Sequence, residues 1–153
     1  MFIPDAIFYE ENSYEFELGK KLLEAYKNQN IPMVIIDNHN NIEQMRKKEN
    51  KEFPYIKRNL IIATRKTHKY GENHKVSDYL VPYTSSGCTA MCMYCYLVCN
   101  YNKCAYLRLF VNREYMLDKI KKTANKFDKE MVFENEWTNQ VYEHKGCGEG
   151  IRL

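Results

Sequence analysis

Five of the six cysteines in this chain lie between Cys88 and Cys104, and three of them have a spacing that suits a metal centre. Cys88, Cys92 and Cys95 supply three thiols within eight residues, a stretch short enough to wrap one face of an iron-sulfur cubane. Such clusters prefer soft thiolates, and three ligands leave one iron open. That open iron can chelate the amino and carboxylate groups of S-adenosylmethionine and pass one electron to its sulfonium. The spacing therefore predicts a [4Fe-4S] cluster used for radical chemistry.

Two other interpretations of the cysteines stay open from spacing alone. Cys92 and Cys95 could join Cys99 and Cys104 in a four-sulfur zinc site, although this spacing is less regular than that of a zinc knuckle. Unliganded buried thiols are common for single cysteines but unusual for five so close together.

Tyr94 directly precedes the third cysteine, in the sequence Cys-Met-Tyr-Cys. An aromatic ring at this position can pack on the adenine of a bound nucleotide, and packing in the protein core is the alternative. The position beside the cysteines favours the nucleotide.

The elements before the cysteines read as a small α/β unit. Apolar, β-rich runs predict strands, and apolar residues at helical spacing predict a helix that ends before Pro32. The expected strands are 6–9, 33–36 and 60–64, and the expected helices are 16–28 and 42–51.

The cysteines follow a predicted loop at residues 84–87, where the backbone can turn closely around a cofactor. Residues 105–111 are predicted as a strand, followed by a helix to about 126 with Asn112 as N-cap and Tyr115, Met116, Ile120 and Ala124 on one face. A further strand is expected at 131–133. The strand, helix, strand order predicts a parallel sheet of βα units.

The amino-acid composition limits which classes of protein this chain can belong to. The 153 residues are 44% hydrophobic and 28% charged, with a formal charge of +3, which indicates a folded chain that is compatible with DNA binding but does not require it. No apolar stretch approaches the ~20 residues that span a bilayer, and residues 1–10 lack the pattern of a signal peptide. We therefore expect a cytoplasmic protein without membrane contact, whose cysteines bind metal or remain thiols instead of forming disulfides.

The cysteine signature and several further landmarks resemble the spore photoproduct lyase family of radical S-adenosylmethionine enzymes. The resemblance extends over residues 1 to about 134. Its landmarks, in order along the chain, are Met1-Phe2-Ile3-Pro4, Leu18-Gly19-Lys20, Arg65-Lys66-Thr67, Ser77-Asp78-Tyr79 with Pro82, Cys95-Tyr96-Leu97 and Leu109-Phe110-Val111-Asn112.

This resemblance implies a DNA repair lyase that reverts the thymine dimer 5-thyminyl-5,6-dihydrothymine to two thymines. Its cofactors would be a [4Fe-4S] cluster on Cys88, Cys92 and Cys95, and S-adenosylmethionine. Tyr96 takes the position of the family's tyrosine implicated in radical return, and Tyr94 that of the aromatic beside the adenine. The implied partners are UV-damaged DNA and an electron donor such as ferredoxin or flavodoxin.

Two departures from the family pattern accompany the resemblance. Trp137 stands where the family has the cysteine that donates hydrogen to the product radical, and Cys147 lies too far along to be taken as its replacement. The family's enzymes are also considerably longer and build a partial barrel of βα units. We therefore expect an α/β domain at 1–80 and, at 81–153, the cluster loop with the incomplete start of that barrel, as in a truncated or frameshifted copy.

A second function from a different class stays open. The chain could be a non-catalytic remnant that binds zinc or an iron-sulfur cluster, or that associates with DNA, without turnover. The sequence does not decide between these functions, and it leaves the oligomeric state and the roles of Cys99 and Cys104 open.

Overall fold

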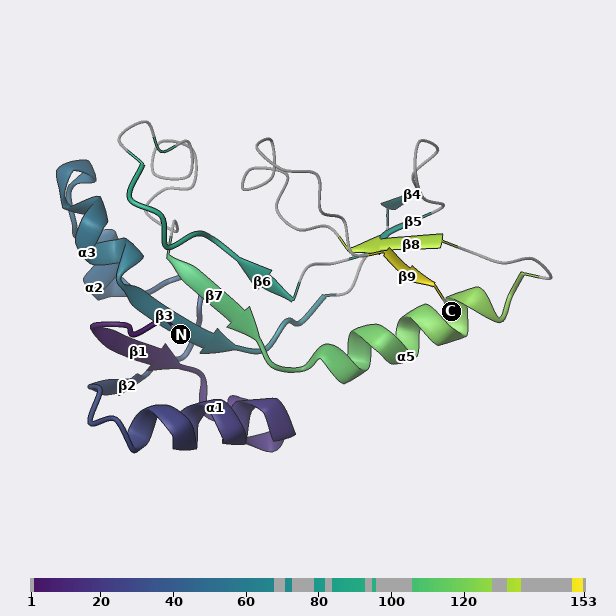
Figure 1. Cartoon of the computed structure of the whole chain (residues 1–153), viewed down its shortest axis with the longest axis horizontal. Coiled ribbons are helices and arrows are strands. Elements are labelled where there is room, and N and C mark those ends of the chain that lie inside the picture. Colours follow the sequence, from purple (N-terminus) through teal and green to yellow (C-terminus); the bar gives the residue numbers. More distant parts are fainter. Residues whose placement is uncertain are drawn as a thin grey trace. The chain divides into compact units, whose positions relative to one another are not determined.

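The computed structural model describes residues 2–67, 71–72, 79–81, 84–92, 95, 106–127, 132–135 and 150–152. The chain forms two compact units, residues 1–64 with 85–111 and residues 65–84 with 112–153. Figure 1 labels the elements of both units. The predicted domain limits, 1–80 and 81–153, stay a prediction.

The first unit is built on a five-stranded sheet with the order β2-β1-β3-β7-β6. Its central strands pair in parallel, and the short edge strand β6 runs antiparallel to β7. The bounds are β1 Ala6–Tyr9, β2 Met33–Ile35, β3 Asn59–Ala63, β6 Ser85–Ser86 and β7 Leu107–Phe110. The predicted α/β class is thereby confirmed.

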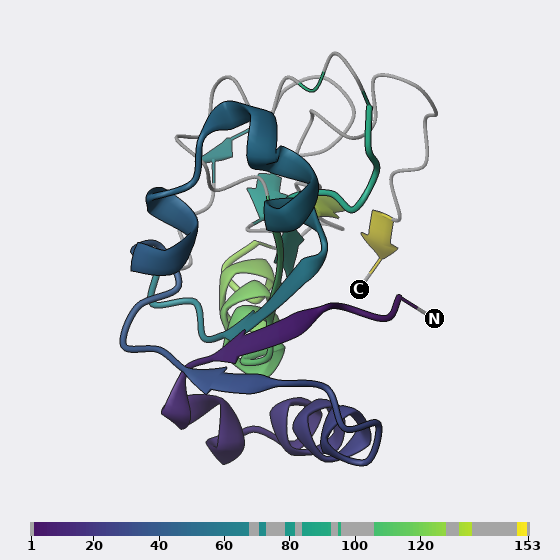
Figure 2. The ribbon, with the colours of Figure 1, turned by 90° about the vertical axis from the view of Figure 1, so that its left-hand side faces the viewer.

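Helices cover both faces of this sheet (Figure 2). α1 (Glu17–Lys27) lies on one face, and α2 (Glu43–Arg46) and α3 (Phe53–Lys57) lie on the other. Along the sheet, the connection from β1 to β2 runs towards one edge, and the connection from β2 to β3 runs back towards the other edge. Because both crossovers are right-handed, α1 in the first connection and α2 and α3 in the second lie on opposite faces. Two short 3-10 turns, Glu11–Glu15 and Asn50–Glu52, complete the connections.

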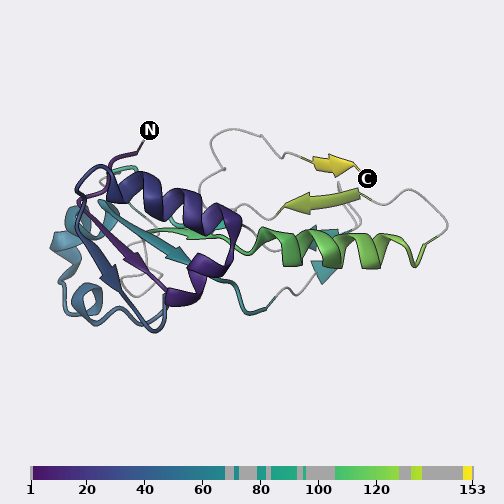
Figure 3. The same ribbon diagram turned by 90° about the horizontal axis from the view of Figure 1, so that it is seen from below.

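The core on the α1 side follows from the alternation of strand residues. Ile7, Leu60 and Ile62 are fully buried and pack with Leu23 and Tyr26 of α1. Figure 3 shows α1 in front of the strands from this side. Because side chains alternate along a strand, the equally buried Phe8 and Ile61 face α2 and α3.

The described residues of the second unit form a four-stranded sheet and the helix α5. The sheet has the order β4-β5-β8-β9, with β5 parallel to β8 and the other pairs antiparallel. Its strands are β4 Gly71–Glu72, β5 Tyr79–Val81, β8 Val132–Asn135 and β9 Gly150–Arg152. α5 (Arg113–Ala124) buries Met116 and Ile120, as expected, but leaves Tyr115 largely exposed.

Two local expectations were wrong. The helix expected at 42–51 ends at Arg46, and a separate helix begins at Phe53, where Pro54 suits the first turn. Residues 84–87, expected as a loop, include β6, which pairs with β7. Asn112 is the N-cap residue of α5, as predicted, although its side chain bonds to the backbone of Arg65, with both contacts at 2.8 Å, and makes no capping bond.

Among the described residues, no helix is both long and apolar enough to cross a membrane.

Candidate metal centre

The cysteine loop leaves the sheet at the end where β7 begins. Ser86 of β6 lies opposite Arg108 of β7, and the two strands run antiparallel, so the chain passes the first residues of β7 as it continues to Cys88. A short edge strand therefore sets the position of the first cysteine. The sequence signal for this strand is weak because it is only two residues long.

The three predicted ligands are free thiols. Cys88 and Cys95 are partly buried, and Cys92 is exposed. The backbone amide of Ala90 points to the sulfur of Cys88 at 3.3 Å, which turns the loop back on its first cysteine. Backbone amides that donate to cysteine sulfur are a usual way to stabilise negative charge on a thiolate ligand.

The donor set suits an iron-sulfur cluster, although the described residues do not gather it. Three unpaired thiols on one loop are the soft ligands that such a cluster takes. In the part of the chain that the structure describes, no three Cys, His, Asp or Glu side chains lie close enough together to hold a metal ion. Binding a cluster here therefore requires the thiols to converge.

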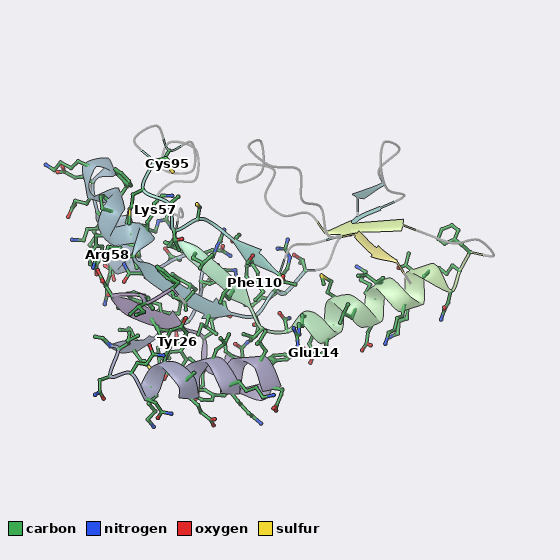
Figure 4. The ribbon with its side chains drawn as sticks, viewed as in Figure 1. Tyr26, Lys57, Arg58, Cys95, Phe110 and Glu114 are labelled. Carbon is green, nitrogen blue, oxygen red and sulfur yellow. The ribbon has the colours of Figure 1, made fainter. Side chains whose placement is uncertain are left out.

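Two buried basic side chains hold the start of this loop. Lys57, the last residue of α3, donates from Nζ to the carbonyl of Cys88 at 3.2 Å. Arg108 donates from Nε to the Ser86 hydroxyl at 2.7 Å and from NH1 to the Asn40 side-chain oxygen at 2.8 Å. Figure 4 labels Lys57, one of these basic residues, and Cys95, the third predicted ligand.

Several predicted site residues lie outside the described part of the chain. They are Tyr94, Tyr96, Trp137, Cys99, Cys104 and Cys147. Their proposed roles stay predictions.

A second polar cluster is centred on Glu10, where β1 and β3 end, and extends to Tyr106 at the start of β7. The buried carboxylate of Glu10 accepts from the backbone and Nδ1 of His39 at 3.0 and 2.8 Å, and from the backbone and hydroxyl of Thr64 at 3.0 and 3.2 Å. An ionised carboxylate only accepts, so Nδ1 of His39 carries the hydrogen. The His39 carbonyl in turn accepts from the Tyr106 hydroxyl at 2.8 Å.

The protonation of Glu10 reflects these partners. Burial raises the pKa of its carboxyl, but the hydrogen bonds from His39 and Thr64 outweigh burial and lower the pKa to about 2. Both oxygens are engaged by donors, so this carboxylate ties the ends of the strands together and is not free to bind a ligand.

Sequence reasoning missed Lys57, Arg108, Glu10 and His39. A lysine after Tyr55-Ile56 and an arginine inside an apolar strand are weak signals, because each could also face solvent. Their partners lie far away in sequence, and only the fold brings them together. A charged residue inside an apolar β-rich run, as Arg108 is, was the one usable sign.

Comparisons with known proteins agree on one family. The family model described as spore photoproduct lyase matches residues 2–143. The spore photoproduct lyase of Bacillus subtilis is 30% identical over 130 residues, which are 84% of this chain and 36% of that protein. The Geobacillus sp. enzyme is 27% identical over 127 residues, which are 82% of this chain and 36% of that protein.

Solved structures give the same match. Spore photoproduct lyase complexed with dinucleoside spore photoproduct has a TM-score of 0.72 at 25% identity, covering 84% of this chain and 38% of that one. A double mutant with bound AdoMet and dinucleoside spore photoproduct has a TM-score of 0.71 at 25% identity, covering 83% and 37%. This chain thus spans little more than a third of the relatives it matches, and within that span it belongs to the spore photoproduct lyase family.

Proposed function

We propose that this chain is the cluster-binding N-terminal part of a radical S-adenosylmethionine lyase that repairs spore photoproduct in DNA. The observation that carries the proposal is the set of three free thiols, Cys88, Cys92 and Cys95, on one loop of a family member. A related structure binds both AdoMet and dinucleoside spore photoproduct, which supports the same ligands here.

Cys88, Cys92 and Cys95 would hold a [4Fe-4S] cluster as thiolates. When bound, the cluster would supply one electron to break a carbon-sulfur bond of S-adenosylmethionine. The protein's part is to present the three sulfurs together, with the Ala90 amide directed at the first of them. Cys92 is the most exposed of the three, so its side chain loses the fewest packing contacts when the thiols converge.

Tyr94 is proposed to pack on the adenine and Tyr96 to return the radical after product formation. Trp137 stands where the family has its hydrogen-donating cysteine, and its indole N–H bond is stronger than a thiol S–H bond. Repair by this chain should therefore be inefficient, even where S-adenosylmethionine is cleaved. Damaged DNA and a ferredoxin- or flavodoxin-type electron donor complete the proposed partners, in the cytoplasm.

Anaerobic reconstitution with iron and sulfide tests the first step. A cluster gives the iron-sulfur absorbance and near-stoichiometric iron and sulfide, whereas zinc uptake without that absorbance would favour a non-catalytic metal-binding remnant. Chromatography for 5′-deoxyadenosine after chemical reduction then tests cleavage. Failure to form it with a full cluster present would refute catalysis and leave metal binding intact.

Repair is tested separately, with spore-photoproduct dinucleotide as substrate and thymine as the product measured. Trp137→Cys should raise the thymine yield above that of the parent chain. Efficient repair by the parent, with no gain from Trp137→Cys, would show that a different residue donates the hydrogen.

A further inference from the structure

Lys57 is almost fully buried although it is a lysine at the end of a short surface helix. Only 1% of its surface is exposed. Lysines are rarely buried to this degree unless they are paired, because transferring an ammonium group out of water is costly. The burial of Lys57 therefore needs a compensating partner.

The partner that the structure provides is neutral. The amino group of Lys57 donates to the backbone carbonyl of Cys88 at 3.2 Å. No ion pair among the described residues includes Lys57. One carbonyl offsets only part of the desolvation of a buried cation, since hydrogen bonding to a neutral group replaces water without neutralising the charge.

Arg108 is in the same situation on the other side of the loop's start. It is 8% exposed and donates to the neutral side chains of Ser86 and Asn40. It too is absent from the ion pairs of the described residues. Two buried cations that have no carboxylate partner among the described residues thus hold residues 86 and 88, at the start of the segment that carries three thiols.

A cluster on three thiolates carries net negative charge. It would therefore supply the counter-charge that neither Lys57 nor Arg108 has among the described residues. We propose that Lys57 is a positioning residue of the metal centre, which fixes the backbone of Cys88 while the other two thiols converge, and whose charge, with that of Arg108, favours the anionic loaded loop. This inference rests on the proposed function for the identity of the bound group. It goes beyond it in assigning a role to a residue outside the cysteine signature.

Lys57→Met tests the role with little risk to the fold. Methionine has a similar length and no charge, so the substitution removes the desolvation cost of a buried ammonium together with its hydrogen bond to Cys88. Lys51→Met is the matched control, since Lys51 is a nearby lysine whose side chain is 79% exposed. Lys57→Arg keeps the charge and a donor.

The first measurement uses the protein without iron. Amide hydrogen exchange of residues 85–92 should be several-fold faster in Lys57→Met than in the parent or in Lys51→Met, because the tether on Cys88 is lost. The second uses reconstituted protein. Iron should pass to a chelator several-fold faster from Lys57→Met, and the cluster's reduction potential, followed by electron paramagnetic resonance, should become more negative, with Lys57→Arg closer to the parent.

The outcomes separate this inference from the proposed function. Unchanged exchange in the iron-free Lys57→Met chain overturns the positioning role, whatever the parent binds. Unchanged chelator loss and potential in a loaded Lys57→Met chain overturn the electrostatic role. A parent chain that takes up no cluster contradicts the proposed function, and the exchange experiment still decides whether Lys57 holds the loop.

Discussion

The two ends of the five-stranded sheet differ in how their buried charged groups are paired. At the carboxyl end, Glu10 receives a donor at each of four contacts from His39 and Thr64. At the amino end, Lys57 and Arg108 are buried against neutral partners beside a loop of free thiols. A saturated polar network stabilises the fold, whereas charge left without a counter-charge marks a place where a ligand can supply one.

The strongest test of this difference is the loss of a single thiol at the amino end. Cys92→Ala should abolish cluster retention, because a three-ligand site has no spare thiolate. The apo chain should keep its stability, since Cys92 is exposed. Iron and sulfide analysis after reconstitution, with a parallel thermal melt, measures both.

Cys99→Ala and Cys104→Ala serve as controls for Cys92→Ala. Both should retain the iron of the parent chain. If either variant loses the metal as completely as Cys92→Ala does, a four-sulfur zinc site becomes the better account of the loop.

A substitution at the carboxyl end should lower the free energy of unfolding and leave the metal content unchanged. Glu10→Gln replaces an oxygen that accepts from Thr64 or His39 by an amide that cannot accept, and leaves buried donors without a partner. We expect a loss of about 3 kcal/mol in the free energy of unfolding. Urea titration of the apo chain measures it, with Glu17→Gln, whose side chain is 70% exposed, as the control.

Acid should act through the same carboxylate. The pKa of Glu10 is about 2 in the folded chain against an ordinary 4.5, so its contribution to stability is complete above about pH 4.5 and is lost as the pH falls towards 2. The stability of Glu10→Gln should therefore depend less on pH in this window than that of the parent. Parallel slopes in urea titrations from pH 5 to pH 2.5 would show that Glu10 is not the group responsible.

A purely steric effect is expected at Gly19 of α1. A Cβ at Gly19 would approach the Ser13 carbonyl more closely than van der Waals contact permits, with a side-chain carbon of Val111 nearby. Because the overlap is with backbone, which cannot move away as a flexible side chain can, Gly19→Ala should destabilise the chain by about 3 kcal/mol despite the better helix propensity of alanine. Thermal melts compare it with Lys20→Ala, an exposed neighbour on the same helix; equal stability of the two would contradict the close approach.

Local pattern was sufficient for most of the sheet and insufficient for its edge. β1 and β3 were predicted because compact apolar runs such as Leu60-Ile61-Ile62 have few other uses. β6 was not predicted, because Ser85-Ser86 has no strand signal and is paired only through its contact with β7. Asn112 was predicted correctly as the N-cap residue of α5, but its sequence position did not show that its side chain bonds to the backbone of Arg65, which is distant in sequence.

In the candidate site, too, some residues could be predicted from the sequence and others could not. The thiols could be predicted because ligand chemistry is encoded in residue type and short spacing. Lys57 could not, because its contact with Cys88 spans 31 residues and exists only once α3 and β6 are placed. Residues that bind can be read from a motif, whereas residues that position the motif depend on tertiary structure.

The pairing of β3 with β7 has a consequence for how the chain folds. Leu60 lies opposite Leu107, so every residue of the cysteine loop belongs to the segment that this pairing closes. Closing a segment of that length costs entropy before any strand contact repays it, which makes such a pairing late and slow to form. The contact between Lys57 and Cys88 depends on the pairing of β3, β7 and β6, so metal that binds the thiols before these strands pair does so without Lys57 holding the loop.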